Sequence, residues 1–285
     1  MKMIRGKNKK ITKLMISTIA IIVVLVAMLS GCIDNKKDEK TITIKGSSTV
    51  LPVATLCAEE YMNKHDNVRI IVSGGGSSLG IKSVGTGDAD IGDASREIKQ
   101  SEIDAYPDVN FVDHKIALDG VAVIVSKEIY NSGVTDISLE QLKAIYNGTI
   151  NNWNILGGPD EEIFVNEREE GSGTRDTFME LVDLEETNAD IAHSANSQVK
   201  QAVSNSQVGI GYVGLGYVDE DTPALSIDNV SPTSETIQLG TYPISRSLHM
   251  YTNGEPSGEV KKFLDFIMGP EGQAIVEEEG FIPIN

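Results

Sequence analysis

The hydrophobic and polar positions of this chain follow two alternating periods, which predict strands followed by helices. Residues 41–45 (TITIK) are apolar at every second position, as in a half-buried strand. Residues 50–63 then have helical spacing, with Pro52 in the first turn, where a helix tolerates it. The same order returns as a strand at 68–73 and a helix at 79–84. This repetition favours an α/β fold with a parallel, doubly wound sheet.

The pattern continues to the C-terminus. Residues 90–96 (DIGDASR) are expected to follow a third, short strand, and residues 242–251 to cross back towards the first part of the chain. Ser138 is expected to cap one helix, and the last residues, FIPIN, to pack against the body. The remaining predicted elements are β-rich stretches at 116–126, 163–166 and 208–218, and helices at 138–147, 259–268 and 271–279.

Three turns that join a strand to a helix share one composition. They are GSST (46–49), GGGSS (74–78) and GSGT (171–174). Such a turn presents free backbone N–H groups and the positive end of the helix dipole, which suits an anion. One such turn is common helix capping, but three of them at the carboxyl ends of strands favour a binding site.

A tetrahedral oxyanion needs several donors for each oxygen. Arg168 can supply a charged, bidentate contact, and Glu170 could hold its guanidinium in place. The alternative for Arg168 is a surface salt bridge with Glu167 or Glu170. The candidate hydroxyl ligands are Ser48, Thr49, Ser77, Ser172 and Thr174.

Motifs of several enzyme classes are missing from the sequence. There is no G-x-x-x-x-G-K-[ST] phosphate loop and no G-x-S-x-G elbow around Ser172. The four histidines are scattered without metal-ligand spacing, and Cys57 in its apolar stretch is interpreted as a small buried hydrophobe. The sequence therefore predicts no metal, no cofactor and no catalytic residues, although an enzyme acting on a phosphoester stays as an alternative.

The first 32 residues have the layout of a signal peptide. Six Lys/Arg precede a nearly apolar run at 14–29, which ends in Leu29-Ser30-Gly31-Cys32. This junction resembles a lipobox, in which Cys32 becomes the lipidated N-terminus; an uncleaved membrane anchor is the alternative. Residues 33–40 are expected to be a charged linker. Both alternatives place the rest of the chain on the extracytoplasmic face of the cell membrane.

The remainder of the chain is strongly acidic. Six of the chain's 24 Lys/Arg lie in the leader, whereas none of its 42 Asp/Glu do. Nucleic acid is therefore not an expected partner, because no basic face is available to displace its counterions. An anion must be bound by local dipoles and a few arginines against the general field.

Nine stretches resemble the phosphate-binding lipoprotein of the high-affinity phosphate ABC transporter. They cover most of residues 41–285, in the family's order. These stretches are GSSTVLP (46–52), GGGSSLGIK (74–82), DADIGDASREIK (88–99), DGVAVIVS (119–126), LEQLKAIYNGTINNW (139–153), REEGSGTRDTF (168–178), GIGYVGLGY (209–217), YPISRSLHMYT (242–252) and FLDFIMGPEGQAIVEEEGF (263–281).

The resemblance implies a two-domain, periplasmic-binding-protein-like (type II) fold with a hinged cleft between the domains. Residues 41–121 and 244–285 would form domain I, and residues 122–243 domain II. The protein would capture inorganic phosphate and deliver it to the permease and ATPase subunits of the transporter. The implied phosphate ligands are Ser48, Thr49, Ser77, Ser95 and Arg96 from domain I, and Arg168, Ser172, Gly173 and Thr174 from domain II.

The sequence departs from this family at one position. Well-known members have an aspartate near position 96 that accepts the proton of hydrogen phosphate, whereas this chain has Arg96. Arg96 is expected either to add charge to the site or to form an ion pair between loops. Asp93 is the candidate for the acceptor role. The choice between phosphate and another oxyanion, such as sulfate or molybdate, stays open.

Overall fold

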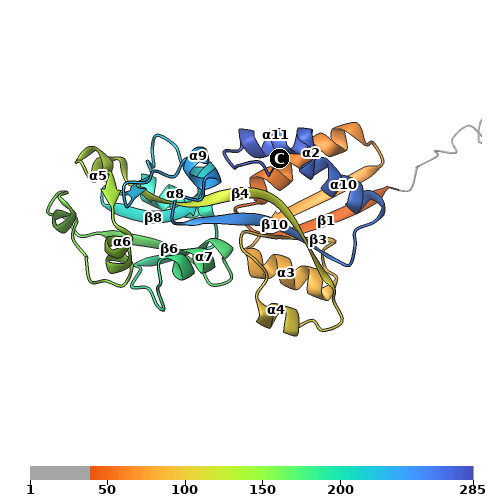
Figure 1. The fold of residues 1–285 in the computed structure, drawn as a ribbon, viewed down its shortest axis with the longest axis horizontal. Coiled ribbons are helices and arrows are strands. Elements are labelled where there is room, and N and C mark those ends of the chain that lie inside the picture. The colour runs from red at the N-terminus through yellow and green to blue at the C-terminus, as the bar shows by residue number, and fades with distance from the viewer. Residues whose placement is uncertain (1–38, 285) are drawn as a thin grey trace, which may run out of the picture. The chain divides into compact units, whose positions relative to one another are not determined.

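The computed structural model describes residues 39–284, and one sheet of eight strands runs through this part of the chain (Figure 1). In spatial order the strands are β2 (Val68–Gly74), β1 (Lys40–Gly46), β3 (Ile91–Ala94), β10 (Ser245–Asn253), β4 (Phe111–Val125), β8 (Gly209–Gly214), β6 (Phe164–Arg168) and β7 (Ile191–His193). A separate two-stranded sheet pairs β5 (Asp136–Ile137) with β9 (Ser226–Ile227).

The helices expected at 50–63, 79–84, 138–147, 259–268 and 271–279 are present, and further helices lie between them. They are α2 (Leu51–Lys64), α3 (Ser77–Thr86), α4 (Gln100–Asp104), α5 (Lys127–Asn131), α6 (Leu139–Tyr146), α7 (Gly173–Leu181), α8 (Asn196–Ser204), α9 (Ser234–Gln238), α10 (Gly258–Met268) and α11 (Pro270–Glu278), with 3-10 turns η1 (Trp153–Leu156) and η2 (Leu215–Tyr217). No helix within residues 39–284 has both the length and the apolar character needed to cross a bilayer.

The sheet is parallel towards both edges and antiparallel at its centre. β1 is parallel to β2 and β3, and β6 is parallel to β7 and β8. β10 is antiparallel to β3 and β4, and β4 is antiparallel to β8. The expected parallel sheet is therefore corrected at its centre, where the two long strands β4 and β10 run antiparallel to one another.

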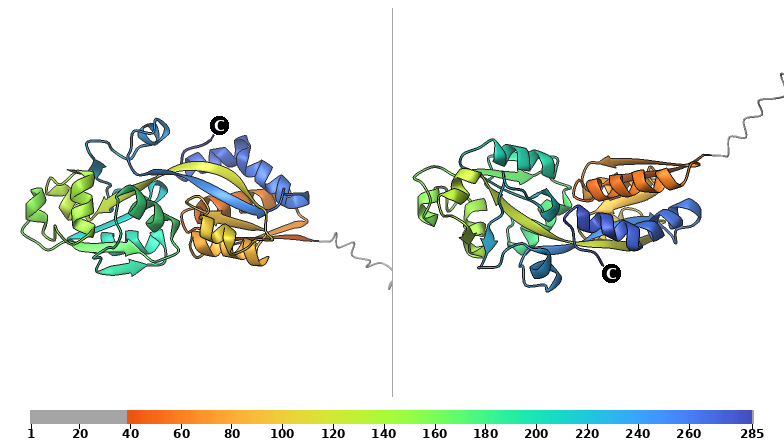
Figure 2. Two further views of the ribbon diagram at one scale, coloured as in Figure 1. Left: turned by 60° about the horizontal axis from the view of Figure 1, so that its bottom comes forward. Right: turned by 90° about the horizontal axis from the view of Figure 1, so that it is seen from above.

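Two large hydrophobic clusters lie along this sheet. One gathers most of the buried apolar residues between Ile42 and Ala117 and between Leu248 and Phe281. The other gathers most of those between Val121 and Ile244, together with Ile282. β4 pairs with β10 along residues 111–120 and with β8 along residues 121–125. β4 and β10 thus pass from one cluster to the other. Figure 2 shows both strands in the two further views of the ribbon.

Most predicted elements are confirmed within a few residues. The exception is residues 90–96, because the third strand lies inside this segment as β3 instead of before it. All four β3 residues are buried, although only two of them are apolar. Ser138 Oγ caps α6 by accepting a hydrogen bond from Gln141 N at 3.0 Å. Phe281 and Ile282 of the last segment are buried, as expected. The predicted leader, Cys32 and nearly all of the linker lie outside the described residues.

Candidate functional site

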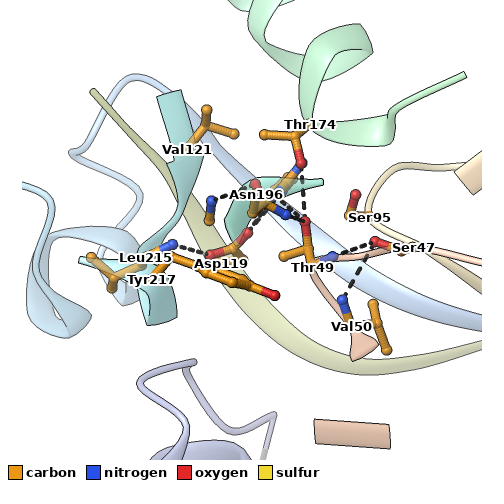
Figure 3. A network of polar contacts seen from close by, with 12 residues as sticks. Ser47, Thr49, Val50, Ser95, Asp119, Val121, Thr174, Asn196, Leu215 and Tyr217 are labelled. Atoms are coloured by element: carbon orange, nitrogen blue, oxygen red, sulfur yellow. Dashed lines mark hydrogen bonds and ion pairs between the residues drawn. The ribbon is translucent and has the colours of Figure 1, made fainter. Parts of the chain in front are cut away.

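The turn before α2 meets residues from the opposite half of the sheet. Thr49 Oγ1 lies 3.0 Å from Thr174 Oγ1, within hydrogen-bond distance and buried (Figure 3). The side-chain amide of Asn196 donates to Thr49 Oγ1 at 2.9 Å and to Ser48 Oγ at 3.2 Å. Ser47 Oγ holds the turn by accepting from the backbone N–H groups of Thr49 and Val50. Three hydroxyls of the first turn and that of Thr174, at the start of α7, therefore lie together.

The second and third Gly/Ser turns meet one another. Ser78 N donates to Gly171 O at 3.1 Å. Gly76 has a φ of 98°, and a Cβ on it would lie 2.8 Å from the same carbonyl oxygen. Glycine is needed at this position for both reasons, since neither the left-handed backbone nor the close approach admits a side chain.

The start of α7 approaches Ser77 of the second Gly/Ser turn and Ser95, which follows β3. Ser77 Oγ accepts from Ser95 N at 3.0 Å. A Cβ at Gly173 would lie 2.2 Å from Ser77 Oγ and 2.6 Å from Ser95 Oγ. Ser172 caps α7 by accepting from Arg175 N at 3.2 Å. Free N–H groups of a helix start and several hydroxyls therefore converge, which is the donor set that an oxyanion requires.

Arg168 is a buried charge at the end of β6, the strand that leads into α7. Its side chain is 1% exposed, and it donates from Nε to His193 O at 3.1 Å and from Nη2 to Ser194 O at 2.8 Å. Nη1 is buried and has no hydrogen-bond partner among the described residues. Burial lowers the pKa of Arg168 to about 10. A buried guanidinium held by carbonyls, with one nitrogen free, is suited to an anionic ligand.

The acidic neighbours of Arg168 have other roles. Glu170, which was expected to hold the guanidinium of Arg168 in place, lies in an exposed position. The backbone carbonyls of His193 and Ser194 hold that guanidinium instead. Glu167 instead forms an ion pair with Arg175 at 3.3 Å. Burial of Arg168 argues against the alternative of a surface salt bridge.

Arg96 forms an ion-pair network between loops and helices. Its Nε donates to Asp176 at 2.7 Å, and its Nη1 and Nη2 donate to the two oxygens of Glu102, both at 2.8 Å. Ser78 Oγ and the carbonyl of Glu97 accept its remaining hydrogens. Although burial opposes ionisation of Glu102, hydrogen bonds and charge from Arg96 lower its pKa. All five N–H groups of Arg96 are engaged, which supports the ion-pair alternative.

Asp93, the candidate acceptor, is buried with its Oδ1 unpaired among the described residues. Burial raises its pKa well above the ordinary value. The backbone of Asp93 contacts the first turn, because Ser47 N donates a hydrogen bond to Asp93 O at 3.0 Å.

Three buried polar residues at the site escaped the sequence-based prediction. Asn196 begins α8 without a Gly/Ser turn, so no pattern marks it. Asp119 and Arg246 form an ion pair, with Nη2 to Oδ2 at 2.7 Å, and Arg246 Nη2 also lies 3.3 Å from Thr49 Oγ1. One signal was present, because Asp119 interrupts the apolar run 116–126.

The described residues offer no hydrolytic arrangement. Ser172 Oγ is occupied as a helix cap, and the His193 ring lies 2.9 Å from Asn166 Oδ1. Within residues 39–284 no group of three or more His, Cys, Asp or Glu side chains could hold a metal ion. Trp153 is buried in one of the hydrophobic clusters and its ring N–H donates to Val208 O at 2.9 Å, so it is a packing residue. Cys57 is likewise buried, and burial raises its pKa to about 12.

The chain that carries these donors is similar to proteins of a known family. Residues 35–271 match the model of the PBP superfamily domain. The phosphate-binding protein PstS of Bacillus subtilis (strain 168) is 36% identical over 253 residues, which cover 87% of this chain and 82% of that protein. PstS of Borreliella burgdorferi is 31% identical over 281 residues, covering 92% of this chain and 98% of that protein.

A solved structure with bound phosphate is also similar. It is the crystal structure of a substrate-binding protein assigned to a phosphate ABC transporter of Clostridium perfringens, with a TM-score of 0.81 and 37% identity; the match covers 86% of this chain and all of that one. These similarities confirm the expected α/β, two-domain periplasmic-binding-protein-like fold. The chain belongs to the family of PstS phosphate-binding proteins within the PBP superfamily.

Proposed function

We propose that this protein captures inorganic phosphate between its two domains and delivers it to the permease of an ABC transporter. The observation that carries the proposal is the buried Arg168, which ends the strand that leads into α7 and whose Nη1 lacks a partner among the described residues. The proposed ligands are Ser48, Thr49, Ser77, Ser95, Ser172, Gly173 and Thr174, with Arg168 as the charged ligand. Arg96, with all its N–H groups engaged, is proposed to hold the loops instead.

The domains are proposed to comprise residues 41–121 with 244–285, and residues 122–243. The two hydrophobic clusters support this division, because their members change near residues 118–121 and 244–248. β4 and β10 would then act as the hinge, since both pass between the clusters. Contacts such as Thr49 with Thr174 would form when the domains close on phosphate.

The protein is proposed to act outside the cytoplasm, tethered through a lipid on Cys32. The basic start, the apolar run and the Leu-Ser-Gly-Cys junction support this location. Mass spectrometry of membrane-associated protein tests it: an N-terminal diacylglyceryl cysteine at position 32 is expected, whereas an intact Met1 would refute the lipid anchor.

Calorimetric titration tests the binding function. The full chain, freed of anion by unfolding and refolding, is titrated with phosphate and then with sulfate at several pH values. Tight binding of phosphate and weak binding of sulfate are expected. Equal binding of both, or none of phosphate, would contradict the proposal and move the ligand to another oxyanion.

The protein is also proposed to bind without catalysis. A chromogenic phosphomonoester, offered with and without divalent metal ions, should release no product above the rate in buffer. Turnover that disappears in the Ser172→Ala variant would instead make the chain an enzyme.

A further inference from the structure

We propose that Arg246 is a second arginine ligand of the bound anion and that Asp119 is the residue that positions it. This inference rests on the proposed phosphate site and extends it to a residue on β10. Neither residue belongs to the three Gly/Ser turns, and both lie on the strands that link the two hydrophobic clusters.

The contacts of Arg246 leave one side of its guanidinium unpaired. Nε and Nη2 both donate to Asp119 Oδ2, at 2.9 Å and 2.7 Å. Nη2 also donates to Thr49 Oγ1 at 3.3 Å. Nη1 is buried and has no partner among the described residues. A buried, charged donor without an acceptor is costly, so a ligand that supplies the acceptor should bind there.

The planar shape of the guanidinium indicates where the unpaired donor points. Its five N–H groups have fixed directions, and the outer hydrogens of Nη1 and Nη2 are parallel. Since the outer hydrogen of Nη2 is directed at Thr49 Oγ1, that of Nη1 is directed to the same side. Thr49 Oγ1 is also the atom that contacts Thr174 and Asn196 (Figure 3). Nη1 of Arg246 therefore faces the proposed phosphate site.

Arg168 shows the same feature from the other half of the sheet. It too is buried, with Nε and Nη2 engaged and Nη1 unpaired among the described residues. Burial lowers the pKa of Arg168, and the positive charge of Arg246 acts in the same direction. Two buried like charges repel one another, and a dianion that both arginines contact would offset that repulsion.

Asp119 holds Arg246 in this orientation. The carboxylate is fully buried, and its Oδ1 accepts from Leu215 N at 2.9 Å. Gly214, at the end of β8, lets this strand approach Thr49 and Asp119 closely. A Cβ at Gly214 would lie 2.7 Å from Thr49 Cγ2 and 3.1 Å from Asp119 Oδ2. Burial raises the pKa of Asp119, while the charge and hydrogen bonds of Arg246 act in the opposite direction. Both oxygens already accept hydrogen bonds, so Asp119 acts through Arg246.

The test is calorimetric titration of the anion-free full chain with phosphate. Arg246→Gln should weaken phosphate binding by about 10- to 100-fold, the value of one hydrogen bond to a charged group. Arg246→Lys, which keeps the charge but loses the fork, should lie between this variant and the original chain. Arg69→Gln is the matched control, because Arg69 is exposed on β2. An Arg246→Gln variant that binds as tightly as the Arg69→Gln control would overturn the inference.

Two further variants separate a ligand from a structural residue. Arg246→Gln leaves the Asp119 carboxylate buried without its cation, which could prevent folding. The double variant Asp119→Asn/Arg246→Gln removes both charges, and it should fold yet still bind phosphate weakly. If this double variant retains full affinity, Arg246 is not a ligand.

The positioning role of Asp119 has its own readout. Asp119→Asn should weaken phosphate binding several-fold in the original chain but have no effect in the Arg246→Gln background, because it acts through that arginine. Equal losses in both backgrounds would overturn the positioning role. Failure of the original chain to bind phosphate would refute the proposed function itself, which is a different outcome from wild-type affinity in the Arg246 variants.

Discussion

At the residue scale, the site is built from a few buried polar groups whose partners are incomplete. Arg168 has carbonyl partners on two of its nitrogens and none on Nη1 among the described residues. A charge in this state destabilises the fold until a counter-ion arrives. This residue therefore links the energetics of the empty protein to its affinity for an anion.

We expect Arg168→Gln to weaken phosphate binding by about 100-fold or more, because a buried anion loses its charged, forked donor. The empty variant should lose little stability, since the substitution also removes a buried charge whose pKa burial lowers to about 10. Calorimetry measures the first effect and urea unfolding without anion the second. Unchanged affinity would exclude Arg168 as a ligand.

Asp93 gives a prediction about stability and pH. Burial raises its pKa in the folded state well above 3.8, so the folded protein retains a proton that the unfolded chain releases. Stability is therefore lost as the pH rises above 3.8 towards the folded-state pKa. Asn cannot ionise, so Asp93→Asn should raise the free energy of unfolding at pH 7 by about 1–3 kcal/mol.

Urea unfolding at pH 7 and at pH 3.5 measures this effect of Asp93→Asn, and the gain should shrink at the lower pH, where Asp93 of the original chain is mostly protonated in the unfolded state as well. Asp108→Asn is the control, since Asp108 is exposed. A loss of phosphate affinity in Asp93→Asn, with unchanged stability, would instead give Asp93 the acceptor role.

At the element scale, the start of α7 must come close to the first turns. A Cβ at Gly173 would lie 2.2 Å from Ser77 Oγ and 2.6 Å from Ser95 Oγ, although the backbone there is helical and tolerates alanine. We expect Gly173→Ala to reduce phosphate affinity at least about tenfold, equivalent to about 1.4 kcal/mol, while thermal unfolding without anion stays unchanged. Equal affinity would show that α7 need not approach these serines.

Periodicity predicted the long elements because each buries one face. It misplaced β3, since Gly92 and Asp93 resemble a loop and are buried only because β1 and β10 flank them. The Gly/Ser turns were found because helix starts have local signatures. Asn196 and Arg246 were missed because their contacts with Thr49 span 147 and 197 residues, a pairing that no local pattern encodes.

At the scale of the whole molecule, the site joins segments that belong to different hydrophobic clusters. Besides the strands β4 and β10, polar contacts also connect segments of the two proposed domains at the site. Examples are the contact of Thr49 with Thr174 and that of Arg96 with Asp176. Polar contacts of this kind are individually weak when water can compete for them. A bound anion that accepts from both sides would strengthen them all together.

Hydrogen exchange followed by mass spectrometry tests this cooperation. Adding phosphate should slow exchange together at the starts of α2, α3 and α7, which lie far apart in sequence, because one ligand shares their donors. At 100 times its dissociation constant, phosphate should stabilise the protein by about 2.7 kcal/mol, visible as a higher melting temperature. In Arg168→Gln all three segments should lose this protection at the same phosphate concentration. Protection confined to α7 would mean that the anion binds to one half alone, and the two halves would then have to close by some other contact.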